Sequence, residues 1–258
     1  MRFCSLGSGS GGNATLVEAS QGITSTRLLI DAGFSLRELT RRLARAGCEP
    51  EELDAVFITH EHGDHVGCAL ALASRYRLPL ITSRGTWRAI GKPEFEESLL
   101  RLARGGDAVD LGDMLVRPFS VPHDANEPLQ LVLDDADVRL GVVTDLGCAP
   151  PEVAAALAGC RALLLECNHD EGMLRGGPYH PALKKRILGS HGHLSNAAAA
   201  DLLSRCLHAG LNSVSAAHLS EHNNTPELAL AALAEVIGTR SDIRVAHPNL
   251  GLDWLVLN

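Results

Sequence analysis

Short apolar runs alternate along this chain with segments whose apolar residues recur at helical spacing. The short runs, bounded by polar or glycine-rich segments, predict β-strands at residues 2–6, 14–19, 27–30, 53–58, 79–82, 114–121, 129–133, 138–144, 162–167, 212–217, 243–246 and 252–257. The helical spacing, with capping residues at its starts, predicts helices at residues 35–46, 66–76, 84–90, 152–157, 197–208 and from 225 onward. Residues 91–104 fit neither pattern clearly. This order predicts two sheets flanked by helices, in one α/β domain that spans residues 1–258.

The composition agrees with one apolar core. Hydrophobic residues make up 45% of the 258 residues, but aromatic residues only 3%, so Leu, Val, Ile and Ala must fill that core. The seven cysteines are odd in number and form no C-x-x-C pair, so we expect buried thiols in a reducing cytoplasm, not disulfides. The first residues run directly into glycines, unlike a signal peptide, and no apolar run approaches the length of a membrane span.

The densest group of metal-binding side chains lies in residues 59–65, with the sequence THEHGDH. It follows a predicted buried strand, so the pattern H-x-H-x-D-H falls where a strand gives way to a loop. Alternate residues of an extended segment point the same way, so His60 and His62 can bind one ion. Asp64 and His65 can then turn to a second ion. Imidazole and carboxylate ligands together suit zinc, manganese or iron, and not calcium.

Further metal-type residues stand directly after predicted strands. Strand ends in layered α/β domains meet at one edge, where sites are built. We therefore predict two divalent ions, with His60, His62 and His123 as ligands of one, Asp64, His65 and His218 as ligands of the other, and Asp145 bridging both. Seven ligands over two ions leave open positions for hydrolysis. Ions about 3.5–4 Å apart can share an ionised water and hold the substrate oxygens.

Three segments near the predicted ligands hold further candidates. Asp31 ends a strand, where it is a turn residue, a helix cap, or a partner that holds a ligating histidine by its far nitrogen. The loop of residues 7–13 has the sequence GSGSGGN. Because glycine tolerates conformations that other residues avoid, a flexible turn is the default, with Ser10 and Asn13 as candidates for the substrate rim.

Glu166 lies within a buried apolar strand, where a charged residue is costly unless it is paired. We therefore expect a partner for it. His169 follows the same strand, and we place it in the cleft. Asn168 can hydrogen-bond a phosphate, although a turn role is equally consistent with its position.

The net charge of −8 argues against bulk electrostatic binding to nucleic acid. It does not exclude a nucleic acid substrate, because two bound dications add positive charge where a phosphate would lie. Residues 172–192 carry Arg175, Lys184, Lys185 and Arg186. We favour a solvated helix face for them over a local clamp for a polyanion.

The H-x-H-x-D-H stretch, the later His123, the strand-end Asp145 and the final His218 resemble the metallo-β-lactamase superfamily. The match runs from Asp31 to His218. It implies a four-layer αββα sandwich with a dinuclear centre. The segments SGSGGN (8–13), LECNHD (165–170), GHLSN (192–196), AHLS (217–220) and NNTPE (223–227) resemble the bacterial YycJ/WalJ branch. That branch is similar to the tRNA-3′-processing endonuclease and to DNA-processing nucleases of the same fold.

This resemblance implies a metal-dependent phosphodiesterase, a 5′-to-3′ exonuclease with DNA favoured over RNA as its substrate. In these relatives a strand glutamate and a histidine of an H-x-[ST] motif work as a pair, here Glu166 and His193. His193 would donate a proton to the departing oxygen, with Glu166 keeping it cationic, beside the metal ligand Asp64. The chain departs from the relatives in lacking the long inserted domain of the DNA-repair nucleases and the flexible arm of the tRNA-processing type.

Two other functions fit the same ligands. One is hydrolysis of a small ester, thioester, lactone or cyclic phosphate, which does not need the Glu166–His193 pair. The other is a non-catalytic metal-binding or sensor protein, which would be expected to lose ligands, whereas all seven are present. The sequence leaves the oligomeric state open, as well as the choice among zinc, manganese and iron.

Overall fold

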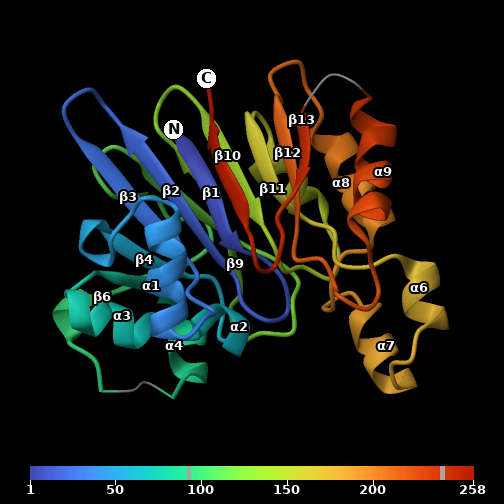
Figure 1. Ribbon diagram of the computed structural model, residues 1–258, viewed down its shortest axis with the longest axis horizontal. Coiled ribbons are helices and arrows are strands. Elements are labelled where there is room, and N and C mark those ends of the chain that lie inside the picture. Colours follow the sequence, from blue (N-terminus) through green and yellow to red (C-terminus); the bar gives the residue numbers. More distant parts are fainter. Residues whose placement is uncertain (92–93, 239–241) are drawn as a thin grey trace.

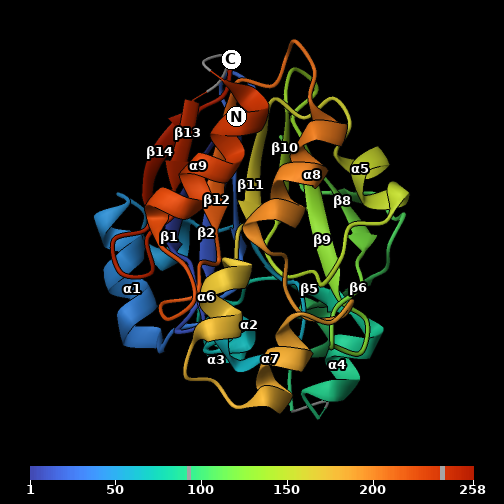
Figure 2. The same ribbon diagram turned by 90° about the vertical axis from the view of Figure 1, so that its right-hand side faces the viewer.

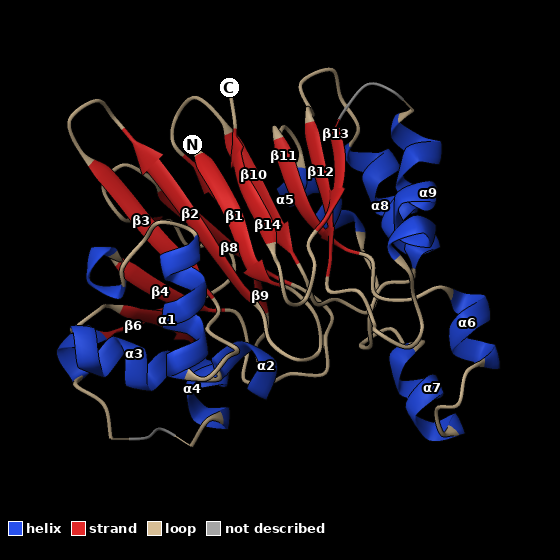
Figure 3. Ribbon diagram, viewed as in Figure 1, coloured by secondary structure: helices blue, strands red, loops and turns tan. Residues whose placement is uncertain are grey.

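In the computed structural model, which describes residues 1–91, 94–238 and 242–258, two seven-stranded sheets pack face to face with helices on their outer faces (Figure 1, Figure 3). The first sheet has the order β14 (Leu252–Val256), β1 (Arg2–Gly7), β2 (Ala14–Ser20), β3 (Ser25–Ile30), β4 (Ala55–Ile58), β5 (Leu80–Ser83), β6 (Leu100–Ala103). The second has the order β13 (Asp242–Val245), β12 (Ser213–Ala217), β11 (Ala162–Glu166), β10 (Arg139–Val143), β9 (Leu129–Asp134), β8 (Leu115–Ser120), β7 (Val109–Asp110).

Each sheet joins an antiparallel part to a parallel part. In the first sheet, β14 to β3 pair antiparallel and β3 to β6 pair parallel. In the second, β7 to β10 pair antiparallel and β10 to β13 pair parallel. Parallel strands end at the same edge, so each sheet gathers the loops that follow its parallel strands at one edge.

The helices cover both outer faces. On the first sheet lie α1 (Leu36–Arg45), α2 (Gly63–Val66), α3 (Ala69–Tyr76) and α4 (Arg84–Ala89), with short 3₁₀ turns at Pro50–Glu52 and Glu97–Leu99. On the second lie α5 (Pro151–Leu157), α8 (Asn196–Cys206) and α9 (Pro226–Ile237). The short helices α6 (Glu171–Gly176) and α7 (Pro181–Ile187) extend beyond the sheets at the end of the molecule where α2 and α4 lie (Figure 1, Figure 2).

Three apolar layers hold these elements together. Residues such as Phe3, Phe57 and Leu131 fill the space between the sheets. Leu39 and Leu72 belong to the cluster between the first sheet and its helices. The corresponding cluster on the second sheet contains the buried leucines of α8 and α9. The prediction of a four-layer αββα sandwich is confirmed, and aliphatic side chains make up most of its core.

Several helix and strand boundaries differ from the prediction, and two segments show the physical reason. The helix predicted at residues 66–76 is divided into α2 and α3, because Gly67 adopts φ 34° and a Cβ there would lie 2.3 Å from the carbonyl oxygen of Ala32. Within the ambiguous segment 91–104, residues 92–93 lie outside the described part, and residues 100–103 form the strand β6. This strand is at the edge of its sheet with exposed positions, which weakens its apolar signal.

Within the described residues, no helix combines the length and the apolar character needed to cross a membrane. All seven cysteines are free thiols, and six of them are buried, as the sequence predicted. The assignment of residues 1–258 to one domain stays a prediction.

Candidate metal centre

The H-x-H-x-D-H stretch changes from extended to helical backbone at its middle. His60 lies just after β4, and His62 keeps an extended conformation (φ −63°, ψ 147°) as the residue that precedes α2. Asp64 and His65 lie inside α2, whose turn directs them away from the line of the first two histidines. One heptapeptide can therefore present two separate groups of ligand atoms.

Three ring nitrogens form the first donor set. His60 Nε2 lies 3.0 Å from His62 Nδ1, and His123 Nε2 lies 3.3 Å from the same atom. His60 is fully buried, and His123, which follows β8, is 3% exposed. The structure thus brings together the three histidines predicted to share one ion.

A carboxylate and two ring nitrogens form the second donor set. Asp64 Oδ2 lies 3.6 Å from His65 Nε2 and 3.5 Å from His218 Nε2. Asp145, which follows β10, lies between the two sets: its Oδ2 is 3.1 Å from His65 Nε2 and its Oδ1 is 3.9 Å from His123 Nε2. All seven predicted ligands meet at one edge of the sandwich.

In the two donor sets, the outer nitrogen of each buried ring is held by a polar group, which leaves the inner nitrogen to face the centre. The contacts are His60 Nδ1 to Thr59 Oγ1 (3.0 Å), His65 Nδ1 to Asp31 Oδ2 (2.8 Å), His123 Nδ1 to the carbonyl oxygen of Gly192 (3.0 Å) and His218 Nδ1 to Glu166 Oε1 (3.2 Å). Of the roles considered for Asp31, the geometry therefore corresponds to holding a ligating histidine by its far nitrogen.

Unpaired buried atoms indicate that this arrangement is built for cations. Asp145 Oδ2 and His218 Nε2 are buried, yet neither makes an aligned hydrogen bond within the described residues. Leaving such an atom without a partner costs about 1–3 kcal/mol. A divalent cation among these nitrogen and oxygen donors would supply the missing partner, and the donor types suit zinc, manganese or iron. The residues present therefore fit divalent ions.

The electrostatics of the centre also favour positive charge. Burial, with His65 close by, holds the pKa of His60 well below its ordinary value, so this ring is the neutral form that binds metals. Burial likewise lowers the pKa of His123. For His218, burial acts in the same direction, but the Asp145 carboxylate and the nearby Asp64 and Glu166 carboxylates raise its pKa to about 10. The buried carboxylates thus stabilise positive charge at this position.

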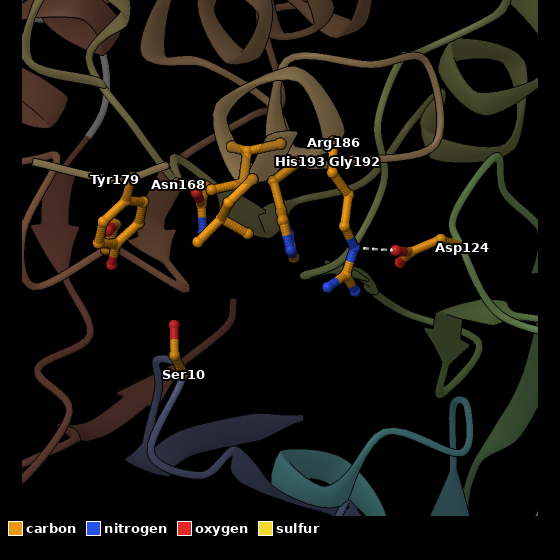
Figure 4. A pocket seen from close by; sticks show the side chains of 10 residues that line it. Ser10, Asp124, Asn168, Tyr179, Arg186, Gly192 and His193 are labelled. Atoms are coloured by element: carbon orange, nitrogen blue, oxygen red, sulfur yellow. Dashed lines mark hydrogen bonds and ion pairs between the residues drawn. The ribbon is translucent and has the colours of Figure 1, made fainter. Parts of the chain in front are cut away.

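Glu166 has the partners that its burial requires. Its Oε1 accepts from His193 Nδ1 at 2.7 Å, and its Oε2 accepts from the backbone N–H groups of Leu146 (3.0 Å) and Leu194 (3.1 Å). Burial lowers the pKa of His193, but Glu166 more than offsets this, and the pKa of His193 lies above its ordinary value. The His193 side chain is 21% exposed and reaches a cavity (Figure 4).

That cavity has a volume of about 190 Å³. Some of the other predicted rim residues line it, and the rest are buried away from it. Ser10 and Asn168 line it, and Ser10 lies across it from His193 (Figure 4). Asn13 is buried beneath: its Nδ2 lies 3.1 Å from His65 Nε2, and its Oδ1 accepts from the N–H of Gly9. His169 is only 1% exposed, and neither of its ring nitrogens has a partner among the described residues.

Two residues of the centre adopt the left-handed backbone conformation although neither is glycine. Asp31 has φ 61° and His218 has φ 54°. Such positions cost about 1–3 kcal/mol each and persist only where their surroundings hold them. The Asp31 carboxylate accepts from the N–H and the hydroxyl of Thr59, and the N–H of His218 donates to Ser8 Oγ at 2.8 Å.

Sequence reasoning missed several of these supporting groups. Thr59 and Ser8 gave no signal of their own, because a threonine before a histidine motif and a serine in a glycine loop are common. Asp124 and Arg186 did carry a signal, since one follows His123 and the other lies in the basic segment. Their ion pair, with Arg186 Nε 2.5 Å from Asp124 Oδ2, joins positions too far apart in sequence to be predicted.

Comparisons with known proteins identify the family of this chain. Residues 26–210 match the model of the β-lactamase superfamily domain. The chain is 35% identical to exodeoxyribonuclease WalJ of Streptococcus pneumoniae (strain D39), over 88% of this chain and 85% of that protein. It is 32% identical to exodeoxyribonuclease YycJ of Bacillus anthracis, over 92% and 89%.

Among solved structures, the metallo-β-lactamase fold protein YhfI of Bacillus subtilis superposes with a TM-score of 0.74 at 15% identity, covering 99% of both chains. This likeness concerns the fold, whereas the family model and the two relatives match the sequence itself. The chain belongs to the β-lactamase superfamily, within the family that includes WalJ and YycJ.

Proposed function

We propose that this protein is a phosphodiesterase that depends on two divalent metal ions and degrades DNA as a 5′-to-3′ exonuclease. The observation that carries the proposal is the convergence of two donor sets around Asp145, with the Glu166–His193 pair beside them. The relatives named exodeoxyribonuclease support DNA as the substrate. The direction of cleavage follows the resemblance to their branch.

His60, His62 and His123 would hold one ion, and Asp64, His65 and His218 the other, with Asp145 shared between them. Two bound ions supply Lewis acidity and neutralise charge that develops on the phosphate. The side chains that hold the rings by their outer nitrogens keep the donors in place during the reaction. Zinc and manganese both match these donors, and iron is a third fit.

His193 would serve as the general acid. Its Nδ1 is occupied by Glu166, so its Nε2 is the ring nitrogen available to the cavity. A proton on Nε2 can pass to the oxygen that leaves phosphorus, while Glu166 fixes the ring and balances its charge. The two backbone donors to Glu166 Oε2 hold the carboxylate itself in position.

The cavity supports a polymeric phosphodiester over a small enclosed substrate. Its volume of about 190 Å³ is below the ~300–1,000 Å³ typical of sites that enclose a whole small molecule. It therefore accommodates one unit of a larger substrate, and the remainder would extend outward. The oxygen that leaves a phosphodiester is a poor leaving group, so a general acid such as the Glu166–His193 pair helps its departure. A hydrolase of small esters or lactones has no evident need for this pair.

The test compares end-labelled single-stranded and duplex DNA and RNA with purified protein in added manganese or zinc. We expect stepwise shortening of DNA from its 5′ end, and none with Asp64→Ala. Bis-p-nitrophenyl phosphate, a lactone and a glutathione thioester complete the panel. Turnover of the lactone or thioester without DNA cleavage would replace the proposal with a small-substrate hydrolase. No turnover by fully metallated protein would favour a sensor.

A further inference from the structure

The outer wall of the cavity, formed by α6, α7 and the segment that leads to His193, contains the four basic residues of the 172–192 segment, and the structure gives them different surroundings. Lys184 Nζ donates to the carbonyl oxygens of Arg175 (2.8 Å) and Gly177 (2.7 Å), so it joins α7 to α6. The Arg175 guanidinium pairs with Glu171 on its own helix at 3.1 Å. Lys185 is exposed and does not line the cavity. Of the four, Arg186 alone lines it.

The Arg186 guanidinium makes one hydrogen bond, to Asp124, and its other N–H donors have no partner among the described residues. Its Nε donates to Asp124 Oδ2 at 2.5 Å, and neither of its Nη groups has a hydrogen-bond partner within the described residues. Figure 4 shows the guanidinium beside His193 with these two groups directed away from Asp124. A guanidinium presents a planar fork of donors that matches two oxygens of a phosphate.

Arg186 can exchange its partner Asp124 for a phosphate at little cost. The Arg186 side chain is 59% exposed, and an ion pair that is so open to water contributes little to stability. Asp124 would not be left isolated, because its Oδ1 lies 3.4 Å from His123 Nε2 and 3.9 Å from His62 Nε2, on the side of the first donor set. An incoming phosphate therefore competes with Asp124 at small cost.

The backbone fixes Arg186 relative to the metal centre. The N–H of His193 donates to the carbonyl oxygen of Ile187 at 3.0 Å, so the end of α7 is joined directly to the general acid. The carbonyl oxygen of the intervening Gly192 accepts from His123 Nδ1 at 3.0 Å. A Cβ on Gly192 would lie 2.1 Å from the Ile187 carbonyl oxygen, so this close packing requires glycine. A phosphate held by Arg186 would thus lie at a set position relative to both donor sets.

We infer that Arg186 is a substrate-binding residue that leaves Asp124 to bind a backbone phosphate next to the phosphodiester that is cleaved, with the flanking nucleotide unit held in the cavity. The inference rests on the proposed function and specifies its substrate: a strand with at least two consecutive phosphates. A single phosphodiester without a neighbouring phosphate does not use Arg186. The polar groups of Ser10 and Asn168 and the ring of Tyr179 line the space that the nucleotide would occupy.

The experiment measures binding of a short fluorescein-labelled single-stranded DNA by anisotropy, over a range of salt concentrations. The metal-loaded His193→Ala protein is the background, so that the strand is not consumed. Adding Arg186→Met should weaken binding about 10-fold, the loss expected for a hydrogen bond to a charged group. It should also reduce the slope of log affinity against log salt by about 0.7, the value for one phosphate contact on a single strand.

Arg175→Met is the matched control, because this arginine is 64% exposed and ion-paired as well, but lies outside the cavity. It should change the affinity less than about 2-fold. Arg186→Lys should also bind the DNA strand weakly, since lysine keeps the charge but lacks the planar fork of donors of a guanidinium. In the wild-type background, Arg186→Met should lose more activity on DNA than on bis-p-nitrophenyl phosphate. Metal analysis and thermal unfolding of the same preparation verify that the variant folds and binds metal.

Equal affinity and equal salt slope for Arg186→Met and its background would overturn the inference while leaving the proposed nuclease intact. So would an equal loss on DNA and on bis-p-nitrophenyl phosphate, because Arg186 would then act through the metal centre. If the background protein does not bind the strand and the wild type does not cleave it, the proposed function fails, and this inference fails with it.

Discussion

The outer wall lines the cavity and the metal centre lies next to it, joined through the bond between Gly192 and His123, but the two are built in opposite ways. In the centre, His60 and His65 are fully buried, and each outer nitrogen is fixed by a neighbour. In the wall, Arg175 and Arg186 are 64% and 59% exposed and rely on single surface ion pairs. Buried, mutually fixed groups hold a geometry, whereas exposed pairs can exchange partners. Under the proposed function, this difference assigns the chemistry to the centre and substrate binding to the wall.

The largest effect is expected from Asp145→Ala, which removes the carboxylate shared by both donor sets. Each ion contributes several kcal/mol of charge stabilisation, so DNA cleavage should fall by about 10⁴-fold or more. Initial rates on end-labelled DNA measure this. The matched control is Asp113→Ala, a buried aspartate that bonds to Thr24 and Thr26 away from the centre. Comparable losses in both variants would contradict a special role for Asp145.

His193→Ala should lower the rate by roughly 10²–10⁴-fold while the metal content stays the same, because the proposed general acid is lost and both donor sets keep all their ligands. Glu166→Gln should reduce the rate in the same direction, since the pair works through the bond to His193 Nδ1. Rates and metal analysis on the same preparation check this. If the metal content fell with His193→Ala, His193 would be a ligand and not the acid.

Asp31→Asn should weaken metal binding indirectly, because Asp31 holds the ring of His65 in position. The carboxylate holds His65 Nδ1 at 2.8 Å, and loss of such a partner typically weakens metal affinity by about 10–100-fold. Competition with a chromophoric chelator measures the affinity. Asp54→Asn is the control, because Asp54 is exposed and accepts from the N–H of Arg27 away from the centre. An unchanged affinity in Asp31→Asn would show that the ring is held without this contact.

The smallest effect is expected from Lys184→Met in the wall. It removes two bonds that join α7 to α6, both near the surface. The free energy of unfolding should fall by about 1 kcal/mol or less, with no change in metal content. Thermal unfolding and metal analysis measure the two quantities. Loss of metal would show that the wall and the centre are not independent.

The sequence predicts the centre better than the wall for a physical reason. His60, His62, His123, Asp145 and His218 follow strands, and strand periodicity is a local pattern that determines where each side chain emerges. The buried Glu166 also required a partner by energy alone. Thr59 gave no comparable signal, because a threonine does not by itself indicate a metal site.

The wall depends on pairings that no local pattern encodes. Which of the four basic residues faces the cavity depends on how α6 and α7 pack, whereas the sequence alone shows only a run of basic residues over 172–192. The division of residues 66–76 into two helices likewise depends on the approach of Gly67 to Ala32, a contact between separate elements.

The most direct test of a dinuclear centre is the number of divalent ions bound per chain, measured by inductively coupled plasma mass spectrometry on purified protein after reconstitution and removal of free metal. We expect two ions for the wild type and fewer for Asp145→Ala. A wild-type protein that retains one ion or none under saturating zinc and manganese would show that the centre is not dinuclear.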